Sequence, residues 1–364
     1  MSVEVRPVVS QWELETFLQL PRKIYENNPY WIPAHPMITR KRLLENCNPF
    51  FAHAHVLSFL AWEKGTAVAR LSVIIDQNNP AIDTGFFGFF EAENNPPAVN
   101  KLFTQVPTWL KSQGKNRLLG PFTLSSNEEI GLLIEGFSTT PAIGLSYNPP
   151  YYEQLLTQSN LTKALDFFSY TWNFQPLPEK LIRVAERTES KGMIKISSLA
   201  HHSFRKGAVI FQYLYNQAMA DNWYFSPLTL AEAKTLLRRI SSYADQELLF
   251  LAYLDGNPVG FCFSFPDLNQ ILLQNSGIIP RGREWQNMIT RLRLAILGVI
   301  PSARRRGVES ILILKTLALA QRKGYLEINF SLIAENNTMV NRLIRKNLVD
   351  AQITAKYRVY ELTI

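Results

Sequence analysis

The chain has 364 residues, of which 46% are hydrophobic and 19% are charged, so a disordered chain is excluded and one large or two medium domains are possible. The net charge of +8 favours anionic partners, and two distant cysteines, Cys47 and Cys262, indicate neither a disulfide framework nor a cysteine-based zinc site. No signal-peptide pattern or run of about 18 apolar residues occurs in the sequence, so we expect a cytoplasmic protein.

The first half begins its regular structure with a predicted hairpin. Residues 57–76, LSFLAWEKGTAVARLSVIID, read as strand, glycine turn and strand. A helix is predicted over residues 98–113, ending at Gly114, with a strand at residues 117–120. Glu91 and Glu93 precede this helix, without an arginine or a glycine nearby. Carboxylates at a helix start repel phosphate, so the first half is not expected to hold one.

The second half repeats this order of elements. Residues 248–267 match residues 57–76 without gaps at seven of twenty positions. A helix over residues 308–323 ends at Gly324 and leads into a strand at residues 326–333, as in the first half. Residues 346–362 then resemble residues 159–172, each after an Asn-led helix. These matches predict two copies of one α/β unit, residues 1–172 and residues 173–364.

Between the predicted strand at residues 294–300 and the helix that starts at residue 308 lies a basic loop. Pro301 ends the strand, and three arginines followed by Gly307 precede the helix. The first N–H groups of a helix have no internal partner and carry partial positive charge, so they attract anions. A glycine lets the backbone approach the ligand closely, and guanidinium groups add charge-assisted hydrogen bonds. The loop predicts a diphosphate site, formed by Arg304, Arg305, Arg306, Gly307 and Val308.

The motif V-x-P-x-x-R-R-x-G-V, followed by an apolar helix, a glycine, a strand and an Asn-bearing turn, resembles the GNAT acyltransferase superfamily. In that superfamily this loop holds the pyrophosphate of coenzyme A. The resemblance implies Asn336 or Asn337 in the turn, a helix over residues 339–346 and a last strand over residues 353–362. The usual motif ends in glycine or alanine where this chain has Glu309, which leaves tight binding of coenzyme A open.

The resemblance also implies the fold and the cofactor. We expect an α/β (α+β) protein of two tandem GNAT-like units, each a mixed, mostly antiparallel sheet flanked by helices. Acyl-CoA or acetyl-CoA is the implied co-substrate, without a metal. In the GNAT design a bulge in the fourth strand frees an N–H that polarises the thioester carbonyl. Gly298 permits such a bulge or simply eases packing, and Val299 and Ile300 would supply backbone groups.

Several segments of the first half resemble a bacterial family of uncharacterised, N-acetyltransferase-like tandem GNAT proteins. They are NPYWIP at residues 28–33, GFFGFFEAENN at residues 85–95, and GPFTLSSNEEIGLLIEGF at residues 120–137. Tandem units with one intact phosphate loop also resemble N-myristoyltransferases and Fem ligases. Some bacterial ceramide synthases are GNAT proteins of similar design, which join a long acyl chain to a lipid amine.

Several residues are candidates for the groups that transfer protons. An amine is about one part in a thousand neutral at pH 7, so a base or a water relay is expected. Glu128, Glu129 and Glu335 are the main candidates, although Ser126 with Glu128 and Glu129 also fits a solvated helix cap. The tyrosine that usually protonates the leaving thiolate aligns with Leu343, so a tyrosine of the last strand would replace it, or water would. Other candidates are Glu135, Asp267, His201 and His202 as bases and Tyr357 or Tyr360 as acid.

The expected function is an acyl-CoA-dependent N-acyltransferase that transfers an acetyl or longer acyl group to an amine acceptor bound between the two units. The alternatives are a Fem-like transferase that uses aminoacyl-tRNA and a non-catalytic protein that binds acyl-CoA or another ligand. The acceptor would be a small-molecule or lipid amine. Stable nucleic-acid binding is not expected. Peripheral contact with a membrane is expected. His53 and His55 lack a third ligand nearby, so no metal site is predicted.

Overall fold

The computed structural model describes residues 3–190, 192–282 and 284–364. It divides into two compact units that are not contiguous halves of the chain. The first consists of Met1–Phe167, Leu272–Ile279 and Ala355–Ile364, and the second of Phe168–Ile271 and Pro280–Thr354. The last residues of the chain therefore belong to the first unit, whereas the sequence predicted a boundary between residues 172 and 173.

The first unit contains a mixed sheet in which β1 to β5 lie in chain order, followed by β13. Only β4 and β5 pair in parallel, and β6 also pairs with β13. Its elements are β1 (Glu4–Pro7), α1 (Gln11–Ile24), α2 (Pro36–Leu43), β2 (Ala54–Glu63), β3 (Thr66–Asp76), β4 (Thr84–Ala92), α3 (Pro96–Ser112), β5 (Arg117–Gly120), β6 (Leu132–Glu135) and α4 (Tyr152–Gln158). The strands β7 (Thr162–Asn173) and β13 (Gln352–Thr363) and the helix α8 (Asn269–Gln274) contribute residues to both units.

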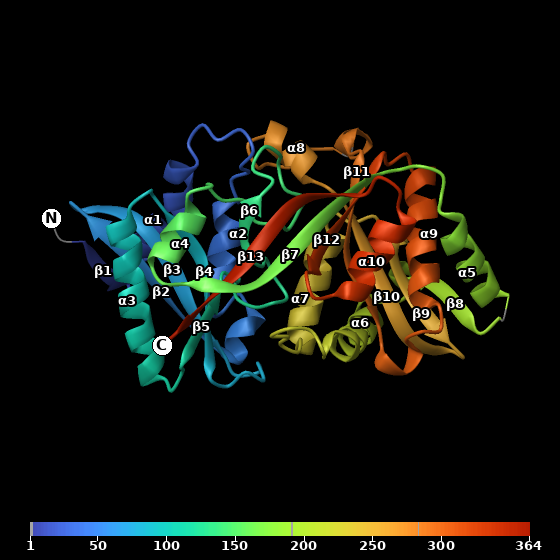
Figure 1. The fold of residues 1–364 in the computed structure, drawn as a ribbon, viewed down its shortest axis with the longest axis horizontal. Helices are drawn as coiled ribbons and strands as arrows, with labels where there is room; N and C mark the ends of the chain where they lie inside the picture. The colour runs from blue at the N-terminus through green and yellow to red at the C-terminus, as the bar shows by residue number, and fades with distance from the viewer. Residues whose placement is uncertain (1–2, 191, 283) are drawn as a thin grey trace. The chain divides into compact units, whose positions relative to one another are not determined.

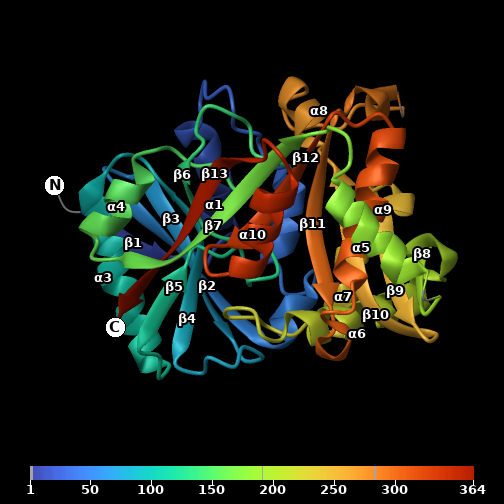
Figure 2. The same ribbon diagram turned by 45° about the vertical axis from the view of Figure 1, so that its right-hand side comes forward.

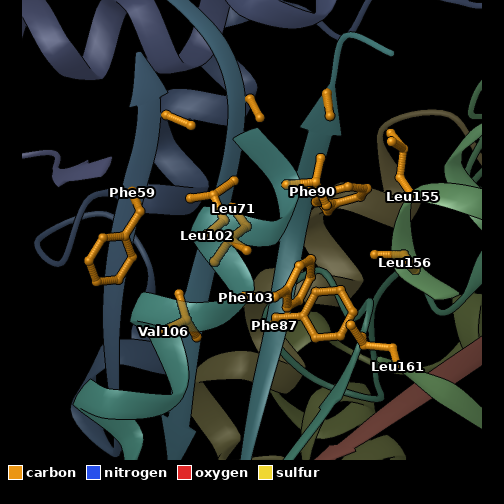
Figure 3. Packing of buried hydrophobic residues seen from close by; sticks show 14 of the residues in the cluster. Phe59, Leu71, Phe87, Phe90, Leu102, Phe103, Val106, Leu155, Leu156 and Leu161 are labelled. Atoms are coloured by element: carbon orange, nitrogen blue, oxygen red, sulfur yellow. The ribbon is translucent and has the colours of Figure 1, made fainter. Parts of the chain in front are cut away.

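The core of the first unit forms because alternate residues of its strands face opposite sides of the sheet. Phe59 of β2 packs in the cluster with the apolar face of α3, whereas the next residue, Leu60, packs with Phe17 of α1. Figure 3 shows Leu102, Phe103 and Val106 of α3 beside the strands, with Val106 one helical turn after the other two. The two helices thus cover opposite faces, with α3 lying along β1 to β3 (Figure 1).

The second unit repeats this plan with the strand order β12-β11-β10-β9-β8, and β7 beside β12. Only β11 and β12 pair in parallel among these. Phe261 and Phe263 of β10 pack on Phe211 of α6, whereas Cys262 between them contacts Thr316 of α9. The two helices therefore cover opposite faces, and α9 lies beside β11 (Figure 1 and Figure 2). The elements are α5 (Glu179–Glu189), β8 (Ile194–Ser198), α6 (Phe204–Met219), α7 (Leu230–Ser241), β9 (Leu249–Leu254), β10 (Asn257–Pro266), β11 (Arg291–Val299), α9 (Val308–Arg322), β12 (Glu327–Ala334) and α10 (Thr338–Asn347).

The internal repeat predicted from the sequence is confirmed. The hairpins β2–β3 and β9–β10 are both antiparallel, and each is followed by a strand, a helix and a second strand parallel to the first. The predicted helix at residues 308–323 is α9, and Gly324 follows it with a φ of 84°, in the left-handed region that a helix-ending glycine adopts. The expected α/β fold of two GNAT-like units is confirmed by this arrangement.

Candidate functional site

The central strand β11 carries a β-bulge. Phe263 of β10 faces Ile296, and the next residue, Ser264, faces Leu294, so Ala295 is an extra residue in β11. Pairing with β12 runs from Arg291 to Leu294 only, and no described residue of β12 pairs with residues 295–299. Residues 295–297 are partly exposed although they belong to a central strand. The bulge therefore leaves apolar side chains and one backbone edge of β11 accessible.

Gly298 is not the bulge residue, so that prediction was wrong. It stands opposite Phe261 in regular antiparallel pairing. A Cβ at this position would lie 2.9 Å from the Ala218 Cβ atom and 3.0 Å from the Met219 Cε atom, both on α6. Gly298 is therefore required by the close approach of a helix, the second of the two readings that the sequence allowed.

The loop from β11 to α9 has an unusual backbone. A short 3₁₀ turn, Pro301–Ala303, follows the strand, and then Arg305 and Gly307 adopt φ values of 62° and 84°. The first helical hydrogen bond of α9 runs from the Ile311 N–H to the Gly307 carbonyl. None of the described residues accepts a hydrogen bond from the backbone N–H groups of residues 305–310. Six consecutive donors at a helix start form an anion-binding arrangement.

The three arginines of the loop differ in what they contact. Arg304 donates from Nη1 to Asp221 Oδ2 at 3.0 Å, from Nη2 to the Ala218 carbonyl at 3.1 Å and from Nε to the Val299 carbonyl at 3.2 Å. Its guanidinium therefore fastens the loop to the C-terminal end of α6, where a cation is favoured. Arg305 and Arg306 are exposed, and no side chain or carbonyl in the described parts of the chain pairs with them.

The other residues predicted at this site have mainly structural contacts. The Ile300 N–H donates to the Val259 carbonyl at 2.9 Å, so this donor is used within the protein. Val308 is fully buried, and its Cγ1 atom lies 3.3 Å from where a Cβ on Gly260 would be. Gly307 has a close neighbour as well, because a Cβ there would lie 2.5 Å from the Thr188 Oγ1 atom of α5. No pattern in the sequence indicates that α5 approaches the loop.

The two asparagines in the turn between β12 and α10 have different roles. Asn337 is the N-cap of α10, and its side chain accepts the Val340 N–H at 3.2 Å. Asn336 is exposed, and its carbonyl accepts the Thr338 N–H. Glu335 is partly exposed, and Leu343 of α10 confirms the lack of a tyrosine at that position. Asn336, Glu335 and the basic loop all belong to the second unit.

Asp267, His201 and His202 also belong to the second unit, whereas Glu128, Glu129, Glu135, Tyr357 and Tyr360 belong to the first, so the structure does not bring all candidates together within one unit. Arg42 pairs with both acidic residues of the EE motif, with its Nη2 atom 2.7 Å from Glu128 Oε2 and its Nη1 atom 3.3 Å from Glu129 Oε1. Tyr357 is fully buried in β13, opposite Leu133 of β6. Partners that satisfy a carboxylate reduce its use as a free base, so the roles of Glu128 and Glu129 stay predictions.

Two functional questions concern metals and membranes. Within the described residues, no three His, Cys, Asp or Glu side chains are grouped as metal ligands, and His53 instead lies 2.8 Å from Asp76 through its Nδ1 atom. None of the helices in those residues is long and apolar enough to cross a bilayer.

Solved structures with this architecture are tandem GNAT proteins. The chain aligns over its whole length with 98% of a tandem GNAT protein from the clavulanic acid biosynthesis pathway, with a TM-score of 0.56 and 10% identity. It also aligns, over 99% of its length, with 95% of a GCN5-related N-acetyltransferase from Sphaerobacter thermophilus, with a TM-score of 0.52 and 14% identity. The chain thus has the tandem GNAT fold.

Sequence similarity then gives the family. No family model matches the chain. Over 99% of its length, however, the chain is 30% identical to 97% of the bacterial ceramide synthase of Caulobacter vibrioides (strain NA1000 / CB15N). It is also 28% identical to 95% of the protein YghO of Escherichia coli (strain K12). The chain belongs to the family of the bacterial ceramide synthase, and it is an acyltransferase.

Proposed function

We propose that this protein transfers a long acyl group from acyl-CoA to the amine of a long-chain amino alcohol. The observation that carries the proposal is the run of six unpartnered N–H groups at residues 305–310, beside the exposed Arg305 and Arg306. This arrangement suits the diphosphate of coenzyme A, with Arg304 holding the loop in place. Glu309 is partly exposed on the first turn of α9, and its backbone N–H remains one of the six donors.

The bulge in β11 suits the thioester part of the co-substrate. Its backbone edge at residues 295–297 would align the pantetheine arm, and a free N–H there would polarise the carbonyl. In the reaction the neutral amine attacks the carbonyl carbon, a C–N bond forms and the C–S bond breaks. The amine loses one proton and the coenzyme A thiolate gains one. Of the three main base candidates, Glu335 belongs to the same unit as the loop.

The family supports a lipid acceptor. Ceramide, the product for which the Caulobacter relative is named, is an amide between a fatty acid and a long-chain amino diol. Both partners of such a reaction are apolar chains with a polar end. Ala295, Ile296 and Leu297 are apolar and partly exposed beside the bulge, which suits an acyl chain better than a polar group.

Peripheral contact with an anionic lipid surface is a further part of the proposal. Helix α2 exposes Met37 and Ile38, at 52% and 59%, next to the exposed Lys41. Changing Met37 and Ile38 together to glutamate should reduce co-sedimentation with vesicles of anionic phospholipid. The matched control changes Val9 and Ile82, which are 82% and 80% exposed in the same unit. Equal sedimentation of both double variants would contradict a contact through α2.

The direct test of the function is a titration with thioesters. Palmitoyl-CoA should raise the melting temperature of the wild-type protein, because a ligand that binds only the folded state stabilises it. With sphinganine added, free coenzyme A thiol should be released in equal amount to the amide formed. If no acyl-CoA from acetyl to palmitoyl gives a shift, the enzyme proposal fails. Stabilisation by aminoacyl-tRNA instead would favour a Fem-like transferase.

A further inference from the structure

A buried polar cluster in the first unit surrounds Glu91, near the end of β4. The Tyr25 hydroxyl donates to Glu91 Oε2 at 2.7 Å, and the Tyr152 hydroxyl donates to the same oxygen at 2.8 Å. The Ala92 N–H in turn donates to the Tyr152 hydroxyl, also at 2.8 Å. The Arg70 Nη2 atom lies 3.8 Å from Glu91 Oε1, beyond hydrogen-bond distance. Oε2 of Glu91 thus accepts two hydrogen bonds, whereas Oε1 accepts none from the described residues.

The backbone around Glu91 repeats the opening seen in β11. Arg70 faces Glu91 and Ser72 faces Gly88, so Phe89 and Phe90 together face a single residue of β3 and form a bulge. The parallel pairing of β4 with β5 covers only Thr84 to Phe86. Glu91 follows this bulge directly. In β4 the first unit therefore has the same kind of bulged, partly unpaired strand as β11 in the second unit.

The helix that follows β4 differs from α9. Pro96 and Pro97, at its first two positions, have no N–H, and the Asn95 side chain accepts the Ala98 N–H at 3.1 Å. These features remove the donors that an anion would need. The sequence prediction that this unit does not hold a phosphate therefore has a structural reason, and the bulge here suits a different ligand.

Two polar atoms of the cluster lack a hydrogen-bond partner among the described residues. No described residue donates a hydrogen bond to Glu91 Oε1, and the buried Nε atom of Arg70 has no acceptor. Arg70 is 5% exposed, and its Nη1 atom donates to the Phe17 carbonyl. The Glu91 side chain is 16% exposed, so its free oxygen remains accessible. An accessible acceptor at the edge of a buried polar cluster is available to a donor group of a ligand.

Aromatic side chains lie next to Tyr25, one of the hydrogen-bond donors to Glu91. Trp31 stacks on Tyr25 with a centroid distance of 4.6 Å, and Tyr147 lies 6.4 Å from Tyr25 and also 6.4 Å from Tyr30. Trp31, Tyr30 and Tyr147 are all partly exposed. Faces of this kind bind hydrocarbon chains and attract cations. Trp31 and Tyr147 therefore place partly exposed aromatic surface beside Tyr25, which itself binds the carboxylate.

We propose that Glu91 binds the amine of the acyl acceptor, with Oε1 accepting a hydrogen bond from the ammonium group and the aromatic side chains contacting the carbon chain. This inference rests on the proposed acyl transfer to an amine, and it identifies the first unit as the acceptor-binding unit. The amine supplies the donor that Oε1 lacks. Arg70 and the tyrosine hydroxyls hold the carboxylate in one orientation, so they are positioning residues.

The electrostatics of the cluster agree with a ligand cation. Burial raises the pKa of Glu91 above its ordinary value, although Arg70 and the two hydroxyls act in the opposite direction. Burial likewise raises the pKa of Tyr25 and of Tyr152, so both stay neutral donors. Glu129 adds a second negative charge that opposes ionisation of Glu91. A cation at Oε1 would offset the cost of the buried carboxylate.

The test compares Glu91→Gln with Glu153→Gln. Glu153 is a matched control because an arginine and a tyrosine also lie beside its carboxylate, which accepts hydrogen bonds from Arg358 at 2.9 Å and from Tyr360 at 3.1 Å. In transfer from palmitoyl-CoA to sphinganine, Glu91→Gln should raise the sphinganine KM by about tenfold or more, with the palmitoyl-CoA KM unchanged, since a charged hydrogen bond is lost. Equal sphinganine KM values in the two variants would overturn the inference.

The wild-type enzyme provides a second readout that does not depend on folding of a variant. Its sphinganine KM should rise as the pH falls from about 8 to about 5, because protonation of Glu91 removes the anion, and Glu91→Gln should abolish that dependence. A pH-independent sphinganine KM in the wild type contradicts the inference. Quenching of tryptophan fluorescence by sphinganine measures acceptor binding without acyl-CoA. It separates failure of this inference from failure of the proposed function, which the thioester titration decides.

Discussion

Reversing the charge of Arg305 and Arg306 together to glutamate is expected to weaken palmitoyl-CoA binding by about a hundredfold or more. Both guanidinium groups are exposed, and neither pairs with a described residue, so a phosphate would find them available. The substitution replaces attraction by repulsion at the same helix start. The melting temperature without ligand should change little, because no contact within the protein is lost. Calorimetry with palmitoyl-CoA measures the effect.

The control for this prediction is Arg238→Glu with Arg239→Glu. These neighbours are exposed on α7 of the same unit, and their reversal changes the net charge by the same amount. Palmitoyl-CoA binding by the control should stay within about threefold of the wild type, since screening limits distant exposed charges. Equal weakening in both double variants would mean that net charge, and not the loop, attracts the thioester.

The basic loop shows what could be predicted from sequence. An apolar run, a proline, a glycine and a long apolar helix are local signals, and they gave the α9 bounds to within one residue. The different roles of Arg304 and its two neighbours have no such signal. Arg304 turns toward α6 because the Ala218 carbonyl and Asp221 lie there, and these residues stand more than 80 positions earlier in the chain.

The bulge position could not be predicted either, because a bulge is defined by the register of the partner strand. Glycine is a common bulge residue, which favoured Gly298 from sequence alone. In the structure the extra residue is Ala295, and nothing in its own side chain marks it. Gly298 is explained by the neighbouring helix α6.

The Glu91 cluster could not be predicted from the sequence for a related reason. Its members come from segments far apart in the chain, with Tyr25 and Tyr152 separated from Glu91 by 66 and 61 positions. From sequence, Glu91 indicated only repulsion of a phosphate. A carboxylate directly after the apolar run at residues 85–90 was the available signal, since buried charges require partners. The partners themselves required the fold.

Gly307→Ala is expected to abolish most acyl-CoA binding and to lower the free energy of unfolding by about 2–4 kcal/mol. Two effects add at this residue. A φ of 84° is unfavourable for alanine, and the new Cβ would lie 2.5 Å from Thr188 Oγ1, which is itself held by a hydrogen bond to the Val184 carbonyl. Relief of the clash would shift the loop and its row of N–H donors. Chemical denaturation and palmitoyl-CoA titration measure the two losses.

The opposite end of the same helix offers the matched control. Gly324 also has a φ of 84°, but a Cβ there would meet no atom within 4 Å. Gly324→Ala should therefore cost only the backbone term, about 1 kcal/mol, and leave palmitoyl-CoA binding intact. Adding Thr188→Ala to the Gly307→Ala variant should recover part of the lost stability and affinity, because the hydroxyl and methyl groups that the Cβ meets are removed. Equal losses in the two glycine variants, with no recovery in the double variant, would mean that α5 does not hold the loop in its ligand-binding conformation.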